Sequence, residues 1–328
     1  EILYSHINHQ RMNLKIIAKN LKKIPVYIGA SITGELSDVF NNKNEGITKI
    51  TSSLFEASKN LNKFNNLTIN PPVFVGTDGN LLKKDEAVKN YRLVSAANWY
   101  ATSKWVGSLV TNCIFIDCGS TTTDIIPIIT GEPNTVGTSD IERLSKGELV
   151  YTGVLRATIP SITHILPYNG EMIQISFEKF ALMADAHYIL DNISKDQYKC
   201  DTADGRPISY QNCLRRLGRM LCEDLEVLGE ENIKKIAKFL YEKQQEIIRR
   251  AFKKVVRRFI QKTNIRKNEI ICVITGLGED IICKKVAESF GIHHIIPLSQ
   301  LLDSNEKTVV SSAIGVLYLL KEGTGMGK

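Results

Sequence analysis

Hydrophobic residues near the start of the chain form short runs bounded by glycine or proline, a pattern typical of buried strands. "IPVYIGAS" (24–31) predicts one strand, and "PPVFVG" (71–76) predicts another. Between them, Thr33 is placed to cap a helix through "TGELSDVF". Residues 93–110 mix small and aromatic side chains and predict a further helix. The first part of the chain therefore has the pattern of an α/β domain.

The middle of the chain is dominated by helical periodicity. Segments 177–191 and 210–224 predict helices on either side of a polar loop at 200–207. The longest pattern covers 230–262, where apolar residues recur along one helical face. The stretch 270–320 returns to strands alternating with helices. Strands thus occur early and late, with a mostly helical block between them.

One hairpin-like segment, "NCIFIDCGSTTTDIIPII" (112–129), joins two apolar runs through a polar bend. Gly119 permits a positive φ or a close backbone approach at the tip. Ser120, Thr121 and Thr122 add hydroxyl groups beside their backbone N–H groups. Such donors converging on one point form an anion-binding nest. The competing interpretation is an ordinary polar β-turn.

Two carboxylates, Asp117 and Asp124, flank this bend. They would repel a phosphate directly, but they suit a site in which Mg²⁺ lies between them and the phosphate oxygens. The bend is not a Walker-type loop, because it leads into a strand rather than into a helix. It therefore predicts phosphate binding of another kind, with Asp117 and Asp124 as catalytic metal ligands.

A second glycine-rich turn occurs in "VITGLGEDIICKKVA" (273–287), which has the pattern strand, turn, helix. Gly276 and Gly278 let the backbone approach a ligand, and the start of the helix favours anions. Many α/β connections use such a turn without any ligand. Taken with the hairpin, the turn supports a phosphate site.

Composition sets wider limits. A chain of 328 residues exceeds the usual size of a single core, about 250–300 residues, and so predicts two domains. The net charge of +7 suits an anionic small molecule or a nucleic acid. "KKVVRR" (Lys253–Arg258) holds part of the excess. Without an aromatic platform, such a run is typical of a solvated helix face, which disfavours nucleic acid.

Seven cysteines, an odd number without a C-x-x-C pair, indicate reduced thiols and a cytoplasmic protein. No apolar run approaches the ~18–20 residues of a membrane span. We therefore expect no membrane partner. The sequence leaves open whether the chain forms a homo-oligomer.

The order of these motifs resembles the actin/sugar-kinase/heat-shock ATPase superfamily. The D-x-G-[ST]-[ST]-[ST]-x-D hairpin corresponds to its second phosphate loop, "GLGE" to a nucleoside-contacting loop and "SSAIGVLYL" to a closing helix. Six strings are similar to one branch, the hydantoinase/oxoprolinase-related proteins of one-carbon metabolism in methanogens. They are "TGELSD", "VGTDGN", "AANWYATSKWV", "FIDCGSTTTDIIPI", "GELVYTGVLR" and "CDTADGR".

The resemblance implies a ribonuclease H-like, two-lobed α/β fold with a mostly helical insertion. The expected parts are a first lobe at 1–115, a second lobe at 116–165 and 266–328, and the insertion at 166–265. The superfamily also carries a first phosphate hairpin near its N-terminus. Nothing before Ile116 matches that hairpin, so we expect the first lobe to lack it.

The implied activity is an alkyl transfer in methanofuran biosynthesis. The phenol oxygen of γ-glutamyltyramine displaces diphosphate from an aminomethylfuran methyl diphosphate, which makes the partner a phosphorylated small molecule. An ATP-dependent small-molecule kinase or hydantoinase/oxoprolinase-like enzyme is the alternative, with ATP or ADP as ligand. A non-catalytic nucleotide sensor or nucleic-acid-binding regulator is the third class.

Further site residues follow from the matching strings. Lys104, Arg156 and Arg206 are candidates for additional phosphate contacts, although a surface ion pair or a solvated position would also explain each one. Asp78 in "GTDGN" is a candidate catalytic residue. Asp-Gly is also a frequent turn pair, and this favours a structural part for Asp78.

Overall fold

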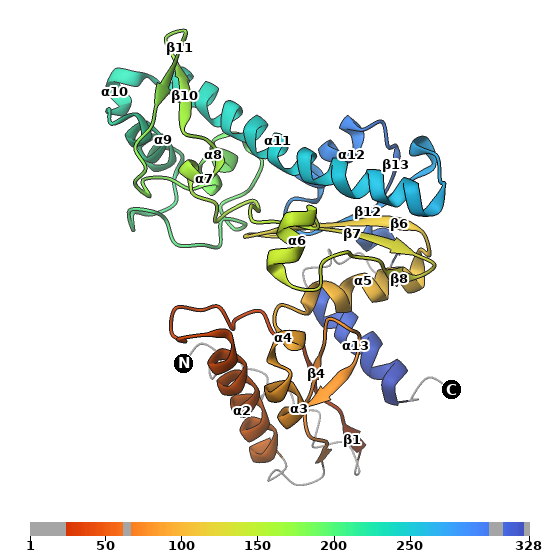
Figure 1. Cartoon of the computed structure of the whole chain (residues 1–328). Helices are drawn as coiled ribbons and strands as arrows, with labels where there is room; N and C mark the ends of the chain where they lie inside the picture. Colours follow the sequence, from red (N-terminus) through yellow and green to blue (C-terminus); the bar gives the residue numbers. More distant parts are fainter. Residues whose placement is uncertain (1–23, 62–66, 302–310, 325–328) are drawn as a thin grey trace. The chain divides into compact units, whose positions relative to one another are not determined.

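The computed structural model describes residues 24–61, 67–301 and 311–324. The chain divides into two compact units, one comprising Glu1–Ser108 with Val310–Lys328 and the other Leu109–Val309 (Figure 1). The C-terminal stretch therefore groups with the first unit, whereas the sequence placed it in the second lobe. The strand that begins at Cys113 groups with the second unit.

The first unit is built on short strands: β1 (Ile24–Val26), β2 (Gly29–Ala30), β3 (Leu67–Ile69), β4 (Val73–Val75) and β5 (Leu81–Lys83). β2 pairs parallel with β4, β4 pairs antiparallel with β5, and β1 pairs parallel with β3. Its helices are α2 (Lys43–Leu61), α3 (Lys84–Lys89), α4 (Tyr91–Val94), α5 (Asn98–Leu109) and α13 (Ser311–Thr324).

Successive residues of β4 serve two cores, because side chains alternate across a strand. Phe74 packs with Ile47 of α2 in one buried cluster. Val75 packs with Ala101 of α5 and Leu319 of α13 in another. The small sheet is therefore covered on both faces.

Two sequence predictions fail in this unit. No helix follows Thr33, and residues 31–42 form turns instead. The Asn42 side chain accepts a 2.9 Å hydrogen bond from the Glu45 N–H, so the helix starts at Lys43. The helix predicted over 93–110 breaks where Ala96 adopts a φ of 49°.

The second unit contains a six-stranded sheet in the order β13-β12-β6-β7-β8, with β9 also paired to β7. Its strands are β6 (Cys113–Cys118), β7 (Thr123–Ile129), β8 (Glu132–Pro133), β9 (Leu149–Val150), β12 (Ile271–Thr275) and β13 (His294–Pro297). β12 runs parallel to both β6 and β13, and β6 and β7 form the expected antiparallel hairpin. The carboxyl ends of β6 and β12 thus meet at one edge.

Helical segments complete this unit. They are α6 (Asp140–Lys146), α7 (Ile159–Ile162), α8 (Met183–Ile189), α9 (Tyr210–Gly218), α10 (Leu225–Leu228), α11 (Glu230–Thr263), a π-helical turn (Glu279–Lys284) and α12 (Lys285–Ser289). A small hairpin, β10 (Ile165–Tyr168) and β11 (Glu171–Gln174), and short 3₁₀ turns at Arg219–Leu221, Lys267–Glu269 and Leu298–Leu301 lie between them. The predicted long helix over 230–262 is confirmed as α11.

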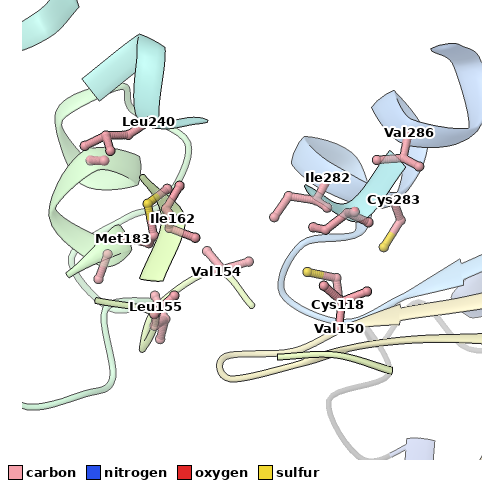
Figure 2. Packing of buried hydrophobic residues seen from close by; sticks show 14 of the residues in the cluster. Cys118, Val150, Val154, Leu155, Ile162, Met183, Leu240, Ile282, Cys283 and Val286 are labelled. Atoms are coloured by element: carbon pink, nitrogen blue, oxygen red, sulfur yellow. The ribbon is translucent and has the colours of Figure 1, made fainter. Parts of the chain in front are cut away.

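One hydrophobic core connects the sheet with the helical block (Figure 2). It includes Cys118 and Val150 from the strands, Val154 and Leu155 from the following segment, and Met183 and Leu240 from α8 and α11. The block expected at 166–265 therefore shares its core with the sheet.

Candidate functional site

The tip of the β6–β7 hairpin presents a row of free backbone donors. The Gly119 N–H donates to the Thr122 carbonyl over 3.0 Å, which closes the bend. Across the described part of the chain, the N–H groups of Ser120, Thr121 and Thr122 donate to no protein acceptor. The Ser120 and Thr121 hydroxyl oxygens lie 3.3 Å apart beside them. We call residues 119–122 the anion nest, because these donors converge without a protein acceptor.

The segment after β9 holds the nest from one side. The Val154 N–H donates to the Gly119 carbonyl over 2.9 Å, and the Leu155 and Arg156 N–H groups donate to the Ser120 carbonyl over 2.9 and 3.0 Å. A Cβ atom on Gly153 would lie only 2.5 Å from the Gly119 oxygen. The carbonyls at the start of the tip are thus turned toward this segment, away from any anion bound by the N–H groups.

The turn after β12 approaches the base of the hairpin. Gly276 has a φ of +92°, and a Cβ atom there would lie 2.4 Å from the Cys118 oxygen and 2.6 Å from Asp117 Oδ1. The Gly278 N–H donates to the Cys118 carbonyl over 2.9 Å. A Cβ atom on Gly278 would lie 2.5 Å from Cys118 Sγ, so both glycines are needed for contact with the hairpin. Their contact with a nucleoside or phosphate stays a prediction.

Gly119 itself differs from the expectation of a positive φ. Its φ lies outside the positive range that the structure records for eight other glycines, and a Cβ atom there would meet nothing nearer than the Thr122 oxygen at 3.9 Å. The bend closes without left-handed backbone at Gly119. The residue that allows the close backbone approach to the tip is instead Gly153, which the sequence did not single out.

Asp117 lies at the end of β6, opposite Asp124 on β7. The partly buried Asp117 carboxylate has no hydrogen bond or ion pair among the described residues. Burial and the neighbouring Asp124 charge raise the Asp117 pKa to about 7. A carboxylate in this state is stabilised by a cation, and Mg²⁺ is commonly held by one or two carboxylates together with phosphate oxygens and water. The residues present therefore fit Mg²⁺.

Asp124 already has a partner. Arg143 of α6 donates to Asp124 Oδ1 over 2.6 Å and to the Glu148 carbonyl over 3.0 Å. The Arg143 side chain is 2% exposed and that of Asp124 13% exposed. This ion pair offsets the Asp124 charge, so Asp117 is the carboxylate that remains available to a cation. The described residues contain no group of three or more protein ligands that would hold a metal without a substrate.

Arg156 and Arg206 both belong to the second unit. Arg156 is exposed, is the last residue of the segment that holds the nest, and has no ion pair among the residues described. Its charge reaches Cys200, where it opposes the rise in thiol pKa caused by burial. Arg206 instead lies 3.8 Å from Asp204. The structure thus places Arg156 beside the nest.

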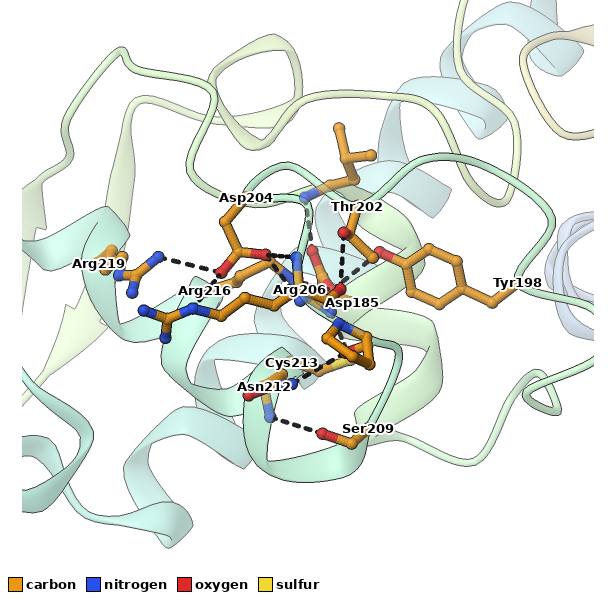
Figure 3. A network of polar contacts seen from close by, with 12 residues as sticks. Asp185, Tyr198, Thr202, Asp204, Arg206, Ser209, Asn212, Cys213, Arg216 and Arg219 are labelled. Carbon is orange, nitrogen blue, oxygen red and sulfur yellow. Dashed lines mark hydrogen bonds and ion pairs between the residues drawn. The ribbon is translucent and has the colours of Figure 1, made fainter.

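Asp204 belongs to a polar network that fixes the 200–207 loop (Figure 3). Arg216, which is fully buried, pairs with Asp185 at 2.8 Å and with Asp204 at 3.1 Å. Arg219 adds a 3.2 Å contact to Asp204. The loop that carries Arg206 is therefore anchored to α8 and α9.

Asp78 and Lys104 lie in the first unit. The Asp78 carboxylate accepts hydrogen bonds from the Asn80 N–H at 3.1 Å and the Asn80 side-chain amide at 2.8 Å. These two hydrogen bonds are typical of a turn, which is the structural role that the Asp-Gly pair predicts for Asp78. Lys104 is a partly buried residue of α5. Catalysis by Asp78 and phosphate contact by Lys104 stay predictions.

The basic run on α11 has a structural use. Arg258 donates to the buried Glu148 carboxylate over 2.8 Å and to the Lys146 carbonyl over 2.8 Å, and Lys254 reaches the Ser145 carbonyl. These cations interact with the C-terminal carbonyls of α6. Of the helices described, none has the length and apolar character needed to span a membrane.

Comparison with known proteins gives consistent matches. The hydantoinase/oxoprolinase family profile matches residues 27–317. The (4-{4-[2-(γ-L-glutamylamino)ethyl]phenoxymethyl}furan-2-yl)methanamine synthase of Methanocaldococcus jannaschii is 36% identical over 282 residues, covering 85% of this chain and 79% of the relative. The synthase of the same name from Methanococcus vannielii is 38% identical over 200 residues, covering 61% of this chain and 81% of that protein.

Among solved structures, nucleotide-free acetone carboxylase, an enzyme of ATP-dependent acetone carboxylation, superimposes with a TM-score of 0.53 at 14% identity. The match covers 83% of this chain and 38% of the acetone carboxylase chain. This likeness shows a shared fold and supports the expected α/β class of the actin/sugar-kinase/heat-shock ATPase type.

Proposed function

The chain belongs to the hydantoinase/oxoprolinase family, and on that premise we propose that it is a transferase of methanofuran biosynthesis. It joins the phenol oxygen of γ-glutamyltyramine to an aminomethylfuran methyl diphosphate and releases diphosphate. The observation that carries the substrate assignment is the 36% identity, over 282 residues, to a synthase whose name describes this aryl ether.

The anion nest is suited to the leaving group. As the bond between carbon and diphosphate breaks, negative charge grows on the bridging oxygen. Three unpartnered N–H groups at Ser120–Thr122 and the nearby Arg156 would stabilise that charge. Their positions are set by the protein before the substrate binds, so little reorganisation accompanies the reaction.

Mg²⁺ fits beside these donors. Asp117 would hold the ion. Asp124, which faces Asp117 on the adjacent strand β7, would stay paired with Arg143. When bound, the ion would add charge stabilisation to the departing diphosphate. Asp117 would also keep the ion at the same end of the hairpin as the nest.

The bond changes balance without a further reactant. A carbon–oxygen bond forms between the phenol oxygen and the furan methylene group, and the bond from this methylene to diphosphate breaks. The phenol proton passes to a base, because a free phenol titrates near pH 10. The furan ring stabilises positive charge on the methylene carbon, so the remaining requirements are orientation and the exclusion of water.

The seven cysteines are all free thiols in the structure. Free thiols persist in reducing compartments, and we accordingly place the enzyme in the cytoplasm.

Calorimetric titration of the full chain tests the assignment of the site. Mg²⁺ with inorganic diphosphate should bind to the wild type and fail to bind to Asp117→Ala, while Mg²⁺ with ADP should bind no more tightly than diphosphate. Tight ADP binding with slow ATP hydrolysis would instead favour the ATP-dependent enzyme, and absence of any phosphate binding would contradict both.

A further inference from the structure

A buried glutamine on the long helix reaches the segment that holds the nest. Gln244 of α11 is fully buried, and its Nε2 donates to the Thr152 hydroxyl and to the Gly153 carbonyl, both over 2.8 Å. The Thr152 carbonyl accepts a 2.8 Å hydrogen bond from the Thr123 hydroxyl of the hairpin. Gln244 is therefore bonded to the two residues that precede Val154, the first residue whose N–H holds the tip.

The other end of the glutamine amide is also occupied. Its Oε1 lies 2.9 Å from Nε2 of His187, which is fully buried on α8. Because Nε2 of Gln244 donates twice, Oε1 is the acceptor and His187 carries its proton on Nε2. Nδ1 of His187 then accepts from the Asn192 side chain at 3.1 Å. Both ends of the Gln244 amide and both ring nitrogens of His187 therefore have hydrogen-bond partners.

This arrangement constrains the nest through steric contact. Gly153 can approach the Gly119 carbonyl only because it lacks a Cβ atom, and its own carbonyl is held by Gln244. A hydrogen bond inside an apolar core is costly to lose, because the buried partner that remains stays unsatisfied. The core around Val154 and Leu240 excludes water from the bond.

We propose that Gln244 is a positioning residue for the anion nest. It fixes segment 152–156 against the hairpin tip, and so connects the helical block to the place where the leaving diphosphate binds. The claim about diphosphate rests on the proposed function, whereas the claim about the order of the tip does not.

Two substitutions of neighbouring glutamines separate this role from general stability. Gln245 lies on the same helix, is 5% exposed, and donates to the Ile281 carbonyl at 3.3 Å. That carbonyl also accepts from the Tyr241 hydroxyl, so Gln245→Met leaves it satisfied and removes only the acceptor of the Arg249 side chain, away from the hairpin tip. Gln244→Met, by contrast, removes the donors to Thr152 and Gly153.

Hydrogen exchange on the ligand-free full chain is the first measurement. Gln244→Met should raise amide exchange at Gly119 and at residues 154–156, whose N–H groups are hydrogen-bonded at the tip, and Gln245→Met should leave it at the wild-type level. Equal exchange in both variants would overturn the proposal, whether or not the protein binds diphosphate.

Binding is the second measurement. For inorganic diphosphate with Mg²⁺, Gln244→Met should raise Kd about 10-fold, as is usual for residues that support a ligand contact indirectly. In turnover, KM for the diphosphate substrate should rise and KM for the phenol substrate should not. A wild type that binds no diphosphate would defeat the proposed function, and the exchange result would still decide the role of Gln244.

If Gln244→Met does not fold, Thr152 provides the same test. Thr152→Ser keeps the hydroxyl that accepts from Gln244, and should retain wild-type exchange at the tip. Thr152→Val keeps the volume, loses the hydroxyl, and should show the raised exchange. Identical behaviour of the two variants would overturn the proposal.

Discussion

Gly153 lies so close to Gly119 that a Cβ atom on Gly153 would stand 2.5 Å from the Gly119 carbonyl oxygen. This contact turns the carbonyls of the hairpin tip toward the segment after β9 and leaves the N–H groups of Ser120–Thr122 without a protein acceptor. The shape of the anion nest thus depends on a residue that lies outside it.

Gly153→Ala should displace the tip, because backbone atoms on the facing hairpin cannot move aside as a flexible side chain would. We expect Kd for Mg²⁺-diphosphate to rise about 10-fold or more. Calorimetric titration measures it. Gly34→Ala is the control, since a Cβ atom there would meet only Ile50 Cδ1 at 3.8 Å. Equal affinities in the two variants would contradict the predicted role of Gly153.

Asp117 predicts a pH dependence of stability. Its pKa is about 7 in the folded protein against 3.8 as the ordinary value, so the folded state binds the extra proton between these limits. The stabilisation of the folded state by this extra proton is fully present below pH 3.8 and is lost as the pH rises through 7. Without Mg²⁺, Asp117→Asn should therefore gain stability relative to wild type at pH 8, by a few kcal/mol at most.

Urea unfolding at pH 5 and pH 8 measures the difference between the two proteins. Adding Mg²⁺ with diphosphate should reduce the pH dependence of the wild type, because a bound cation favours the charged carboxylate. Parallel stability curves for wild type and Asp117→Asn would show that Asp117 is not perturbed.

The Arg143–Asp124 pair should matter for folding. Arg143→Met leaves a poorly exposed carboxylate without its partner, which costs about 3 kcal/mol in the free energy of unfolding. Arg250→Met is the control, because its ion pair with Glu246 is exposed and should contribute nothing measurable. Chemical denaturation compares them. Equal stability of both variants would mean that Asp124 is solvated well enough without Arg143.

The basic run on α11 should not confer nucleic-acid affinity. Arg258 and Lys254 are engaged with α6, which leaves Lys253 and Arg257 as exposed charges. Binding of duplex DNA or RNA at physiological salt should be weaker than about 1 μM, the tight end of non-specific affinity. Fluorescence anisotropy measures it, and tighter, saturable binding lost in Lys253→Gln with Arg257→Gln would contradict this expectation.

The hairpin was predictable because its signal is local. Apolar runs on either side of "DCGSTTTD" determine the two strands, and the structure pairs Asp117 with Asp124 as the sequence suggested. The α11 pattern was predictable for the same reason. The helix after Thr33 was not, because Asn42 provides a competing cap nearer to the amphipathic stretch.

The supports of the nest could not be predicted from one sequence. Gln244 meets Gly153 across 91 positions of the chain, and Arg143 meets Asp124 across 19. No rule of residue spacing along the sequence predicts such contacts. A buried glutamine on the apolar face of α11 was the one available signal, because an uncharged polar residue in that place requires partners.

The most direct measurement is turnover by the purified full chain with γ-glutamyltyramine, the aminomethylfuran methyl diphosphate and Mg²⁺, followed by mass spectrometry. We predict the aryl ether together with an equal amount of diphosphate, formed without ATP and reduced about 100-fold in Asp117→Asn, or about 2.7 kcal/mol of transition-state stabilisation. Ether formation that requires ATP, or that is unaffected by Asp117→Asn, would contradict the account.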